Sequence, residues 1–311
     1  MRDLQGGFPD RALRLALRLP PPINIKGFYL LRALFRAIGQ ATGLLTRISF
    51  GSVEISAPLD HPAVYWRYLP RSFNRNFVAV AKRVVAARAG LVIDVGANIG
   101  DGVALLRAAG VVAPILAIEG ADAWFRLLTS NTRKIAGVEV EKALLGSGAD
   151  ESGLTLTVHE GSGKLVKSTF YTSLTTLDEL MSGYRETPVA LLKTDTDGFD
   201  IRVLLGAEAL LREQAPVLFV EVDEGLLRDQ GNSAQELLDY LGRCGYSSVA
   251  VWDNYGDWLT ARPITDGLSD LIERYPGGPN TPYLDIAAFS EMDQHILDAV
   301  AGEYSIVESA R

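Results

Sequence analysis

Acidic and glycine residues follow several apolar runs of this sequence, where they could bind a ligand and move a proton. The first run is LVIDVGANIG (91–100), in which an acid precedes a turn containing Gly96, Asn98 and Gly100. Glycines let the backbone approach a ligand, and the helix that follows presents N–H groups to it. Glu119 ends the next run, where an acid can accept hydrogen bonds from ribose hydroxyls. This pattern predicts a site for a nucleoside-bearing cofactor.

The spacing of the turn disfavours a dinucleotide. The pyrophosphate of a nicotinamide cofactor is bound by G-x-G-x-x-G. Counted from Gly96, the second and third glycine positions are occupied by Asn98 and Asp101. A side chain and a negative charge would therefore stand in the path of the pyrophosphate. S-adenosylmethionine has no phosphate, so the same turn can hold its amino-acid end.

Two further apolar runs end in acids, ALLKTDTDGFD (190–200) and PVLFVEVD (216–223). Because side chains alternate along a strand, Lys193 and Asp195 share one face. Ligands of open α/β sheets bind beyond the carboxyl ends of the strands, so these acids should gather near the first turn. Asp195, for example, should lie close to Asp94.

Two kinds of chemistry fit acids at these positions. A carboxylate can remove the proton of an acceptor hydroxyl during methyl transfer. Alternatively, Asp195, Glu221 and Asp223 could hold Mg²⁺, which would lower the pKa of that hydroxyl. We favour the metal-free version, with Asp195 indispensable and the other two supporting it, because no His or Asn completes a ligand set. Lys193 could act as a base only if its pKa were strongly lowered, and an ion pair at the strand end is the alternative.

The order of these motifs resembles the FkbM family of S-adenosylmethionine-dependent methyltransferases. The family pattern runs V-D-V-G-A-N-x-G, A-x-E, T-L-D-x-L, L-L-K-x-D-x-E-G and then a strand ending in an acid. The corresponding segments here are IDVGANIG (93–100), AIEG (117–120), TTLDEL (175–180), LLKTDTDGFD (191–200) and LFVEVD (218–223).

Two positions depart from the pattern: Asp197 stands where it has glutamate, and Gly120 where proline is usual. The resemblance implies an α/β, Rossmann-like class I methyltransferase fold: a mostly parallel seven-stranded sheet with helices on both faces, plus an N-terminal helical extension. It also implies O-methylation, often of sugars in surface polysaccharides or of specialised metabolites. The residues that it places around the cofactor are Asp94, Gly96, Ala97, Asn98, Gly100, Glu119, Ala143 and Asp195.

The hydrophobic pattern agrees with an α/β sheet from about residue 78 onwards, because apolar runs alternate with amphipathic segments. Strands are predicted at 91–95, 114–119, 138–145, 154–159, 189–195, 216–222, 246–252 and 283–289. Helices are predicted at 100–109, 121–134, 176–184, 200–213 and 232–244. Residues 253–282 are rich in Pro and Gly and predict an irregular insertion. We divide the chain into an extension (1–77), a methyltransferase domain (78–290) and a C-terminal tail (291–311).

The N-terminal extension is basic, whereas the rest of the chain is acidic. Residues 1–90 contain 14 Lys and Arg against 4 Asp and Glu, and the whole chain has a net charge of −8. A helix over about 28–39 would place Phe28 and Phe35 on one face and Arg32 on another. Such a helix could lie on an anionic membrane, or it could cap its own domain with its arginines in water. We expect residues 1–75 to be an acceptor-binding or membrane-proximal element, separate from the cofactor site.

Composition narrows the class of protein. An apolar fraction of 48% and a charged fraction of 22% are those of a soluble globular protein. The single cysteine, Cys244, excludes an internal disulfide framework and fits a reducing cytosol. We find no membrane span, and an acidic body disfavours nucleic acid as a partner. A glycan, a phosphate-bearing, lipid-linked intermediate of polysaccharide biosynthesis or another hydroxylated small molecule is the expected acceptor.

Two other classes of function use the same sheet. A nicotinamide-dependent sugar oxidoreductase would need the glycine spacing and a Tyr-x-x-x-Lys proton relay, neither of which is present here. A non-catalytic scaffold in a polysaccharide assembly complex would tolerate loss of the acids at 94, 119 and 195, yet all three are present.

Overall fold

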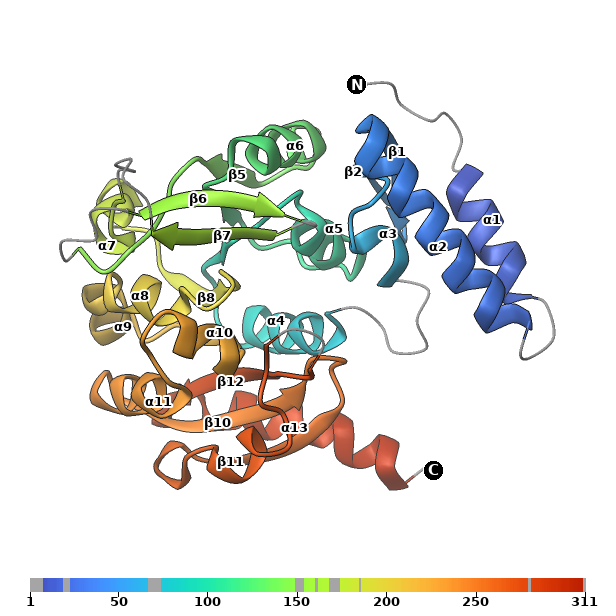
Figure 1. Ribbon diagram of the computed structural model, residues 1–311. Helices are drawn as coiled ribbons and strands as arrows, with labels where there is room; N and C mark the ends of the chain where they lie inside the picture. Colours follow the sequence, from blue (N-terminus) through green and yellow to red (C-terminus); the bar gives the residue numbers. More distant parts are fainter. Residues whose placement is uncertain are drawn as a thin grey trace.

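The computed structural model describes residues 8–18, 23–66, 74–148, 154–159, 162–167, 174–184, 186–278 and 281–309. Its centre is an eight-stranded sheet with helices on both faces (Figure 1). The order of the strands across the sheet is β11 (Trp258–Pro263), β10 (Tyr246–Asp253), β12 (Leu284–Ser290), β9 (Val217–Val222), β8 (Val189–Thr194), β3 (Leu91–Val95), β4 (Ile115–Ile118) and β5 (Val138–Glu141).

Five neighbouring strands, β5, β4, β3, β8 and β9, are parallel. In chain order they follow the 3-2-1-4-5 arrangement of doubly wound folds. The strand β12 then inserts antiparallel between β9 and β10. This is the predicted Rossmann-like α/β fold, but the sheet has eight strands rather than seven. The additional strand, β11, pairs antiparallel with β10 at the edge and lies within the segment 253–282 that we predicted to be irregular.

The helices that follow the strands cover both faces of the sheet (Figure 1). They are α4 (Arg75–Ala87), α5 (Asp101–Ala108), α6 (Asp122–Thr132), α7 (Leu177–Met181), α8 (Asp200–Leu205), α9 (Glu208–Gln214), α10 (Glu224–Asp229), α11 (Ala234–Arg243), α12 (Ser269–Ile272) and α13 (Gln294–Ser309). The single helix predicted over 200–213 is two helices. Between them the backbone at Gly206 approaches Gly146 so closely that a Cβ atom would lie 2.0 Å from its carbonyl oxygen.

Side chains of the central strands are buried on both faces, which explains their continuous apolar runs. On β3, Ile93 and Val95 face one core cluster and Val92 the other. The second cluster also contains Phe77 of α4 and Val300 of α13, so the C-terminal segment contributes a helix to the core. The segment 154–167 forms an antiparallel hairpin of β6 (Leu154–His159) and β7 (Ser162–Lys167), outside the main sheet.

The N-terminal extension packs against the edge of the body as a helical hairpin and a two-stranded sheet (Figure 1). Its elements are α1 (Phe8–Leu17), α2 (Ile23–Thr42), β1 (Leu45–Phe50), β2 (Val53–Pro58) and α3 (Ala63–Trp66). The strands β1 and β2 were not predicted. Phe28 and Phe35 of α2 join a third core cluster with Trp124 of α6. The arginine- and aromatic-rich residues 67–73 lie outside the described residues.

Within the described part of the chain, every helix is too short or too polar to cross a membrane.

Candidate active site

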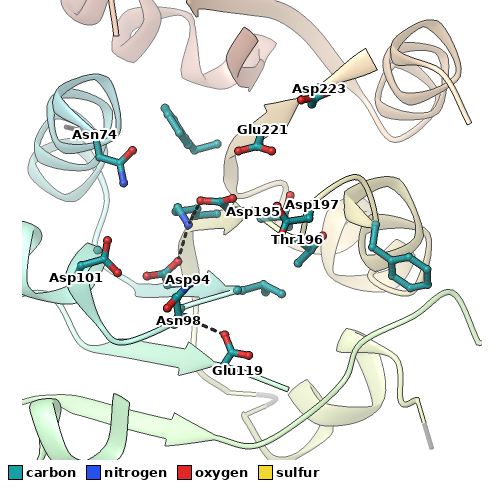
Figure 2. Close-up of a pocket in the computed structure, with 18 of the residues that line it drawn as sticks. Asn74, Asp94, Asn98, Asp101, Glu119, Asp195, Thr196, Asp197, Glu221 and Asp223 are labelled. Carbon is teal, nitrogen blue, oxygen red and sulfur yellow. Dashed lines mark hydrogen bonds and ion pairs between the residues drawn. The ribbon is translucent and has the colours of Figure 1, made fainter. Parts of the chain in front are cut away.

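A cavity of about 570 Å³ opens at the carboxyl ends of the parallel strands, where the sequence predicted the site. This volume is in the range of pockets that enclose small ligands. The turn after β3 and the ends of β4, β8 and β9 form much of its wall (Figure 2). Further lining residues come from α2, from the segment that begins at His61, and from the start of β12. The cavity thus joins the cofactor turn to the acids of the later motifs.

Lys193 holds the two central acids together. Its Nζ atom lies 3.0 Å from Oδ1 of Asp94, its register partner on the neighbouring strand, and 3.1 Å from Oδ2 of Asp195. Burial alone would lower the pKa of Lys193, but the charges of Asp195 and Asp94 outweigh it and raise that pKa. The lysine is therefore protonated at neutral pH and acts as a cation that orients both carboxylates. Of the two roles considered for Lys193, a base or an ion pair at the strand end, the structure has the ion pair.

Gly96 allows the two motifs to touch. Its φ angle is +77°, and a Cβ atom there would lie 2.0 Å from the carbonyl oxygen of Asp195. Any other residue would strain the backbone and displace the end of β8. Gly96 thus allows the turn after β3 to lie directly against the residue that follows β8.

Glu119 braces the cofactor turn from the next strand. Its Oε2 atom accepts the N–H of Asn98 at 2.9 Å (Figure 2). Its Oε1 atom accepts the N–H of Ala121 at 2.7 Å. Asn98 needs this support because its φ angle is 53°, in the left-handed region. Burial raises the pKa of Glu119, whereas these backbone N–H groups lower it. The carboxylate therefore fixes the turn and faces the cavity at the same time.

His61 brings the N-terminal extension into the cavity wall. Its Nδ1 atom accepts the N–H of Ala63 at 3.2 Å, so the proton of the neutral ring is on Nε2, which lies 3.1 Å from Oδ1 of Asn98. Burial lowers the pKa of His61 to about 4, against the opposing effect of the bond to Asn98. At this point the structure contradicts the expectation that residues 1–75 are separate from the cofactor turn. No motif around His61 indicated its contact with Asn98, because the histidine is isolated in the sequence.

We predict that His61→Ala weakens binding of S-adenosylhomocysteine three- to tenfold, because a hydrogen bond of this kind contributes about 0.5–1.5 kcal/mol. The affinity is measured by isothermal titration, with the KM of the methyl donor expected to rise and kcat to stay nearly constant. The control is His295→Ala, since His295 is exposed on α13. Equal affinities of the His61 variant and the control would contradict the positioning role.

Asp195 lies centrally among the acids of the cavity. Figure 2 shows it between Asp94 and Asn98 on one side and Glu221 and Asp223 on the other. Its side chain is 40% exposed, in contrast to the fully buried Asp94, so it can reach a molecule in the cavity. Exposure to the cavity and a fixed orientation are the properties that a general base requires.

Glu221 has a perturbed protonation equilibrium. Burial and then the charge of Asp195 raise its pKa well above the usual value. The phenol of Tyr283 forms a hydrogen bond with it, and the pKa of that phenol is raised, first by the charge of Glu221. Glu221 therefore fits a hydrogen-bonding role better than that of a second base.

Asp223 has a structural task that the sequence did not indicate. Its Oδ1 atom accepts the N–H of Leu226 at 2.9 Å and the N–H of Gly278 at 2.7 Å. It thereby caps α10 and anchors the 253–282 segment. Within the described residues no cluster of three or more His, Cys, Asp or Glu side chains has the geometry to hold a metal ion. The magnesium site suggested for Asp195, Glu221 and Asp223 is thus not supported.

Sequence reasoning missed Asp285, which faces the cavity from β12. Asn76 donates to its Oδ2 atom at 2.7 Å, and burial raises its pKa to about 7. Asp101 of α5, read only as an obstacle to pyrophosphate, also lines the cavity, and burial raises its pKa to about 7. The signal for Asp285 was an acid in the apolar run 283–289.

Of the remaining residues that the resemblance places around the cofactor, two line the cavity and one does not. Ala97 and Ala143 line the cavity, whereas Gly100 lies outside its lining, at the start of α5 and facing α6. The structure explains why glycine stands at position 120 in place of the family's usual proline. A Cβ atom there would lie 2.2 Å from the side chain of Leu144. Leu144 takes the space beside Gly120 and lines the cavity in turn.

Carboxylates outnumber cations in the cavity wall. Among the described residues of the wall, the cations are Arg32 and Lys193, and the acids are Asp94, Asp101, Glu119, Asp195, Asp197, Glu221, Asp223 and Asp285. Such a lining favours a cationic ligand and repels phosphates.

Residues 94–248 match the family model described as the methyltransferase FkbM domain. No curated protein sequence matches the chain. Among solved structures, a methyltransferase FkbM from Methylobacillus flagellatus KT is 13% identical, with a TM-score of 0.39 over 90% of this chain. This chain covers 58% of that protein's length.

Two further solved structures are similar over much of the chain. A METTL16 MTase domain is 13% identical, with a TM-score of 0.43, over 92% of this chain and 82% of that one. A precorrin-6y C5,15-methyltransferase from Geobacter metallireducens GS-15 is 11% identical, with a TM-score of 0.38, over 72% of this chain and 92% of that one. The likeness to the FkbM family rests on the match of residues 94–248 to that family model.

Proposed function

We propose that this chain, which carries a methyltransferase FkbM domain over residues 94–248, uses S-adenosylmethionine to methylate a hydroxyl oxygen. The acceptor in this proposal is a sugar, a polysaccharide intermediate or a hydroxylated specialised metabolite. The observation that carries it is the excess of carboxylates around one cavity that also contains the family motifs. A sulfonium cofactor is cationic and fits that lining, whereas a dinucleotide brings a pyrophosphate.

The residues of the cavity fit the cofactor in shape as well as charge. The volume is sufficient, and the left-handed turn at Asn98 is held open by Glu119. Oδ2 of Asp94 is buried and has no hydrogen-bond partner among the described residues, so it can accept a bond from a ligand. When bound, S-adenosylmethionine supplies an electrophilic methyl group. Asp94, Asn98 and Glu119 would hold it at the end of β3 and β4.

Asp195 is the proposed base. Its carboxylate would accept the proton of the acceptor hydroxyl, and S-adenosylmethionine, when bound, would supply the methyl group for that oxygen. Lys193 keeps the carboxylate in place through the 3.1 Å ion pair. Glu221, Tyr283 and Asp285 also line the cavity and would bind further hydroxyls of the acceptor.

An acceptor with several hydroxyls and no phosphate is thus the best match to this wall. The test uses S-adenosylmethionine with a carbon-13 methyl group and a panel of neutral, amino and phosphorylated sugars. The proposal expects label in methoxy carbons of neutral or amino sugars, identified by their NMR shifts. Label on nitrogen or on ring carbon would contradict O-methylation, and transfer to phosphorylated sugars alone would contradict the acceptor class.

Glu119→Ala is expected to reduce affinity for S-adenosylhomocysteine by about 1–3 kcal/mol, or roughly five- to 150-fold. The change removes the acceptor proposed for the ribose and leaves the N–H groups of Asn98 and Ala121 without their partner. Isothermal titration gives the affinity. Asp122→Ala removes a nearby acid on the exposed surface of α6 and serves as the control. Unchanged affinity in a folded Glu119→Ala protein would refute the ribose assignment.

A further inference from the structure

The outer face of the helical hairpin α1–α2 exposes large apolar side chains. Leu30 is 72% exposed, Leu15 64%, Leu34 52% and Tyr29 51%. They are half of the eight large apolar residues that are exposed in the described part of the chain. Exposed leucines scattered singly are ordinary, whereas several on two packed helices are typical of a surface that binds a partner. We call these four residues the exposed patch.

This patch is not the face that the sequence suggested. Phe28 and Phe35, the apolar face read from the periodicity, are 3% and 5% exposed and pack in the third core cluster. The exposed apolar stripe runs along the other side of α2, through Leu30, Ala33 and Ala37 at helical spacing. Helix α2 is therefore apolar on two faces, and its burial among the described residues is confined to one of them.

Basic residues flank the exposed leucines along the same stripes. Arg11 of α1 is exposed one turn before Leu15, and Arg18, the residue after the helix ends, is exposed three positions beyond Leu15. On α2, the exposed Lys26 precedes Leu30 by one turn. Over residues 8–42 there are six basic residues against one acidic residue, although the chain as a whole is acidic. Leucines that lie between cations on one surface are suited to a bilayer with anionic headgroups. The leucines can insert into the apolar region of the bilayer, and the cations can form ion pairs with the headgroups.

The patch adjoins the cavity. Tyr29 belongs to the exposed patch and also lines the cavity, as does Arg32 one turn further along α2. Figure 1 shows α1 and α2 at the outer edge of the molecule, away from the central sheet. A flat surface can therefore reach them without meeting the helices that cover the sheet.

We infer that the outer face of α1–α2 binds the surface of an anionic lipid bilayer, with Leu15, Leu30 and Leu34 inserted between the headgroups. The cavity then opens beside the membrane, where an acceptor carried on a lipid could enter it. Binding to the bilayer does not depend on the proposed methyl transfer, so the two are tested separately.

The experiment is co-sedimentation of the full-length protein with vesicles of phosphatidylglycerol and phosphatidylcholine, and with vesicles of phosphatidylcholine alone, at low salt. We expect binding to the anionic vesicles only, and a loss of at least tenfold in Leu30→Glu/Leu34→Glu. The control is Val112→Glu, because Val112 is 88% exposed and lies between α5 and β4, outside the patch. It should bind as the wild type does.

Three results would overturn the inference. They are absence of wild-type binding to anionic vesicles, equal binding of the double variant, and equal loss in Val112→Glu. A wild-type dimer that becomes a monomer in the double variant, measured by light scattering, would assign the patch to a second copy instead. If the double variant does not fold by circular dichroism, Leu30→Ser provides the same comparison with a smaller expected loss.

Discussion

Asp195→Asn lowers kcat by about 100-fold or more in this account, because the amide keeps the shape of the carboxylate but cannot take the proton of the acceptor. The side chain is the central acid of the cavity, is 40% exposed, and is held by Lys193. The same change should alter the affinity for S-adenosylhomocysteine much less. Steady-state turnover and isothermal titration on the folded variant measure the two effects separately.

Asp197→Asn is the matched control, since it removes a carboxylate from the same turn and the same cavity lining. Asn tolerates the left-handed backbone at this position, where φ is 53°. We expect its turnover to stay within a few-fold of wild type. A near-wild-type rate for Asp195→Asn, or equal losses in the two variants, would show that Asp195 is not the base.

Lys193→Met is expected to reduce the free energy of unfolding by about 3–5 kcal/mol, the usual effect of removing one partner of a buried ion pair. Asp94 is fully buried, and its Oδ1 atom has Lys193 as its partner at 3.0 Å. Urea unfolding measures the loss. In Lys193→Met/Asp94→Asn neither charge of this ion pair remains, so part of the stability should return.

The loss should also depend on pH. Burial raises the pKa of Asp94, and the charge and hydrogen bond of Lys193 oppose that rise. Without the lysine, the pKa in the folded protein rises further above its unfolded value. The folded variant then binds a proton more readily than the unfolded chain, so its stability falls as pH increases through this interval. Two results would contradict the account. One is a free energy of unfolding of Lys193→Met that is less than 1 kcal/mol below the wild-type value at pH 7, and the other is a difference from wild type that grows as the pH is lowered.

The sequence was sufficient for the parts of the fold that depend on local periodicity. The strands predicted at 91–95, 189–195 and 216–222 differ from β3, β8 and β9 by one residue or less at each end, because parallel strands buried on both faces give unbroken apolar runs. Their order along the chain and the rule for strand ends were enough to bring Asp195 into contact with Asp94 through Lys193.

Contacts between distant segments could not be predicted in this way. The approach of Gly96 to the backbone of Asp195, the bond from His61 to Asn98 and the pairing of Asn76 with Asp285 each join residues far apart in sequence. Nothing in the local pattern around His61 points to a partner. Likewise, periodicity showed that α2 is amphipathic but not which of its two apolar faces the protein would cover.

The claim that the cavity binds S-adenosylmethionine is tested most directly by isothermal titration of the full-length protein with S-adenosylhomocysteine and, separately, with NAD. The carboxylate-rich lining and the turn braced by Glu119 predict saturable binding of S-adenosylhomocysteine to one site and no heat of binding with NAD at the same concentrations. Saturable binding of NAD without binding of S-adenosylhomocysteine would contradict the account and assign the cavity to a dinucleotide.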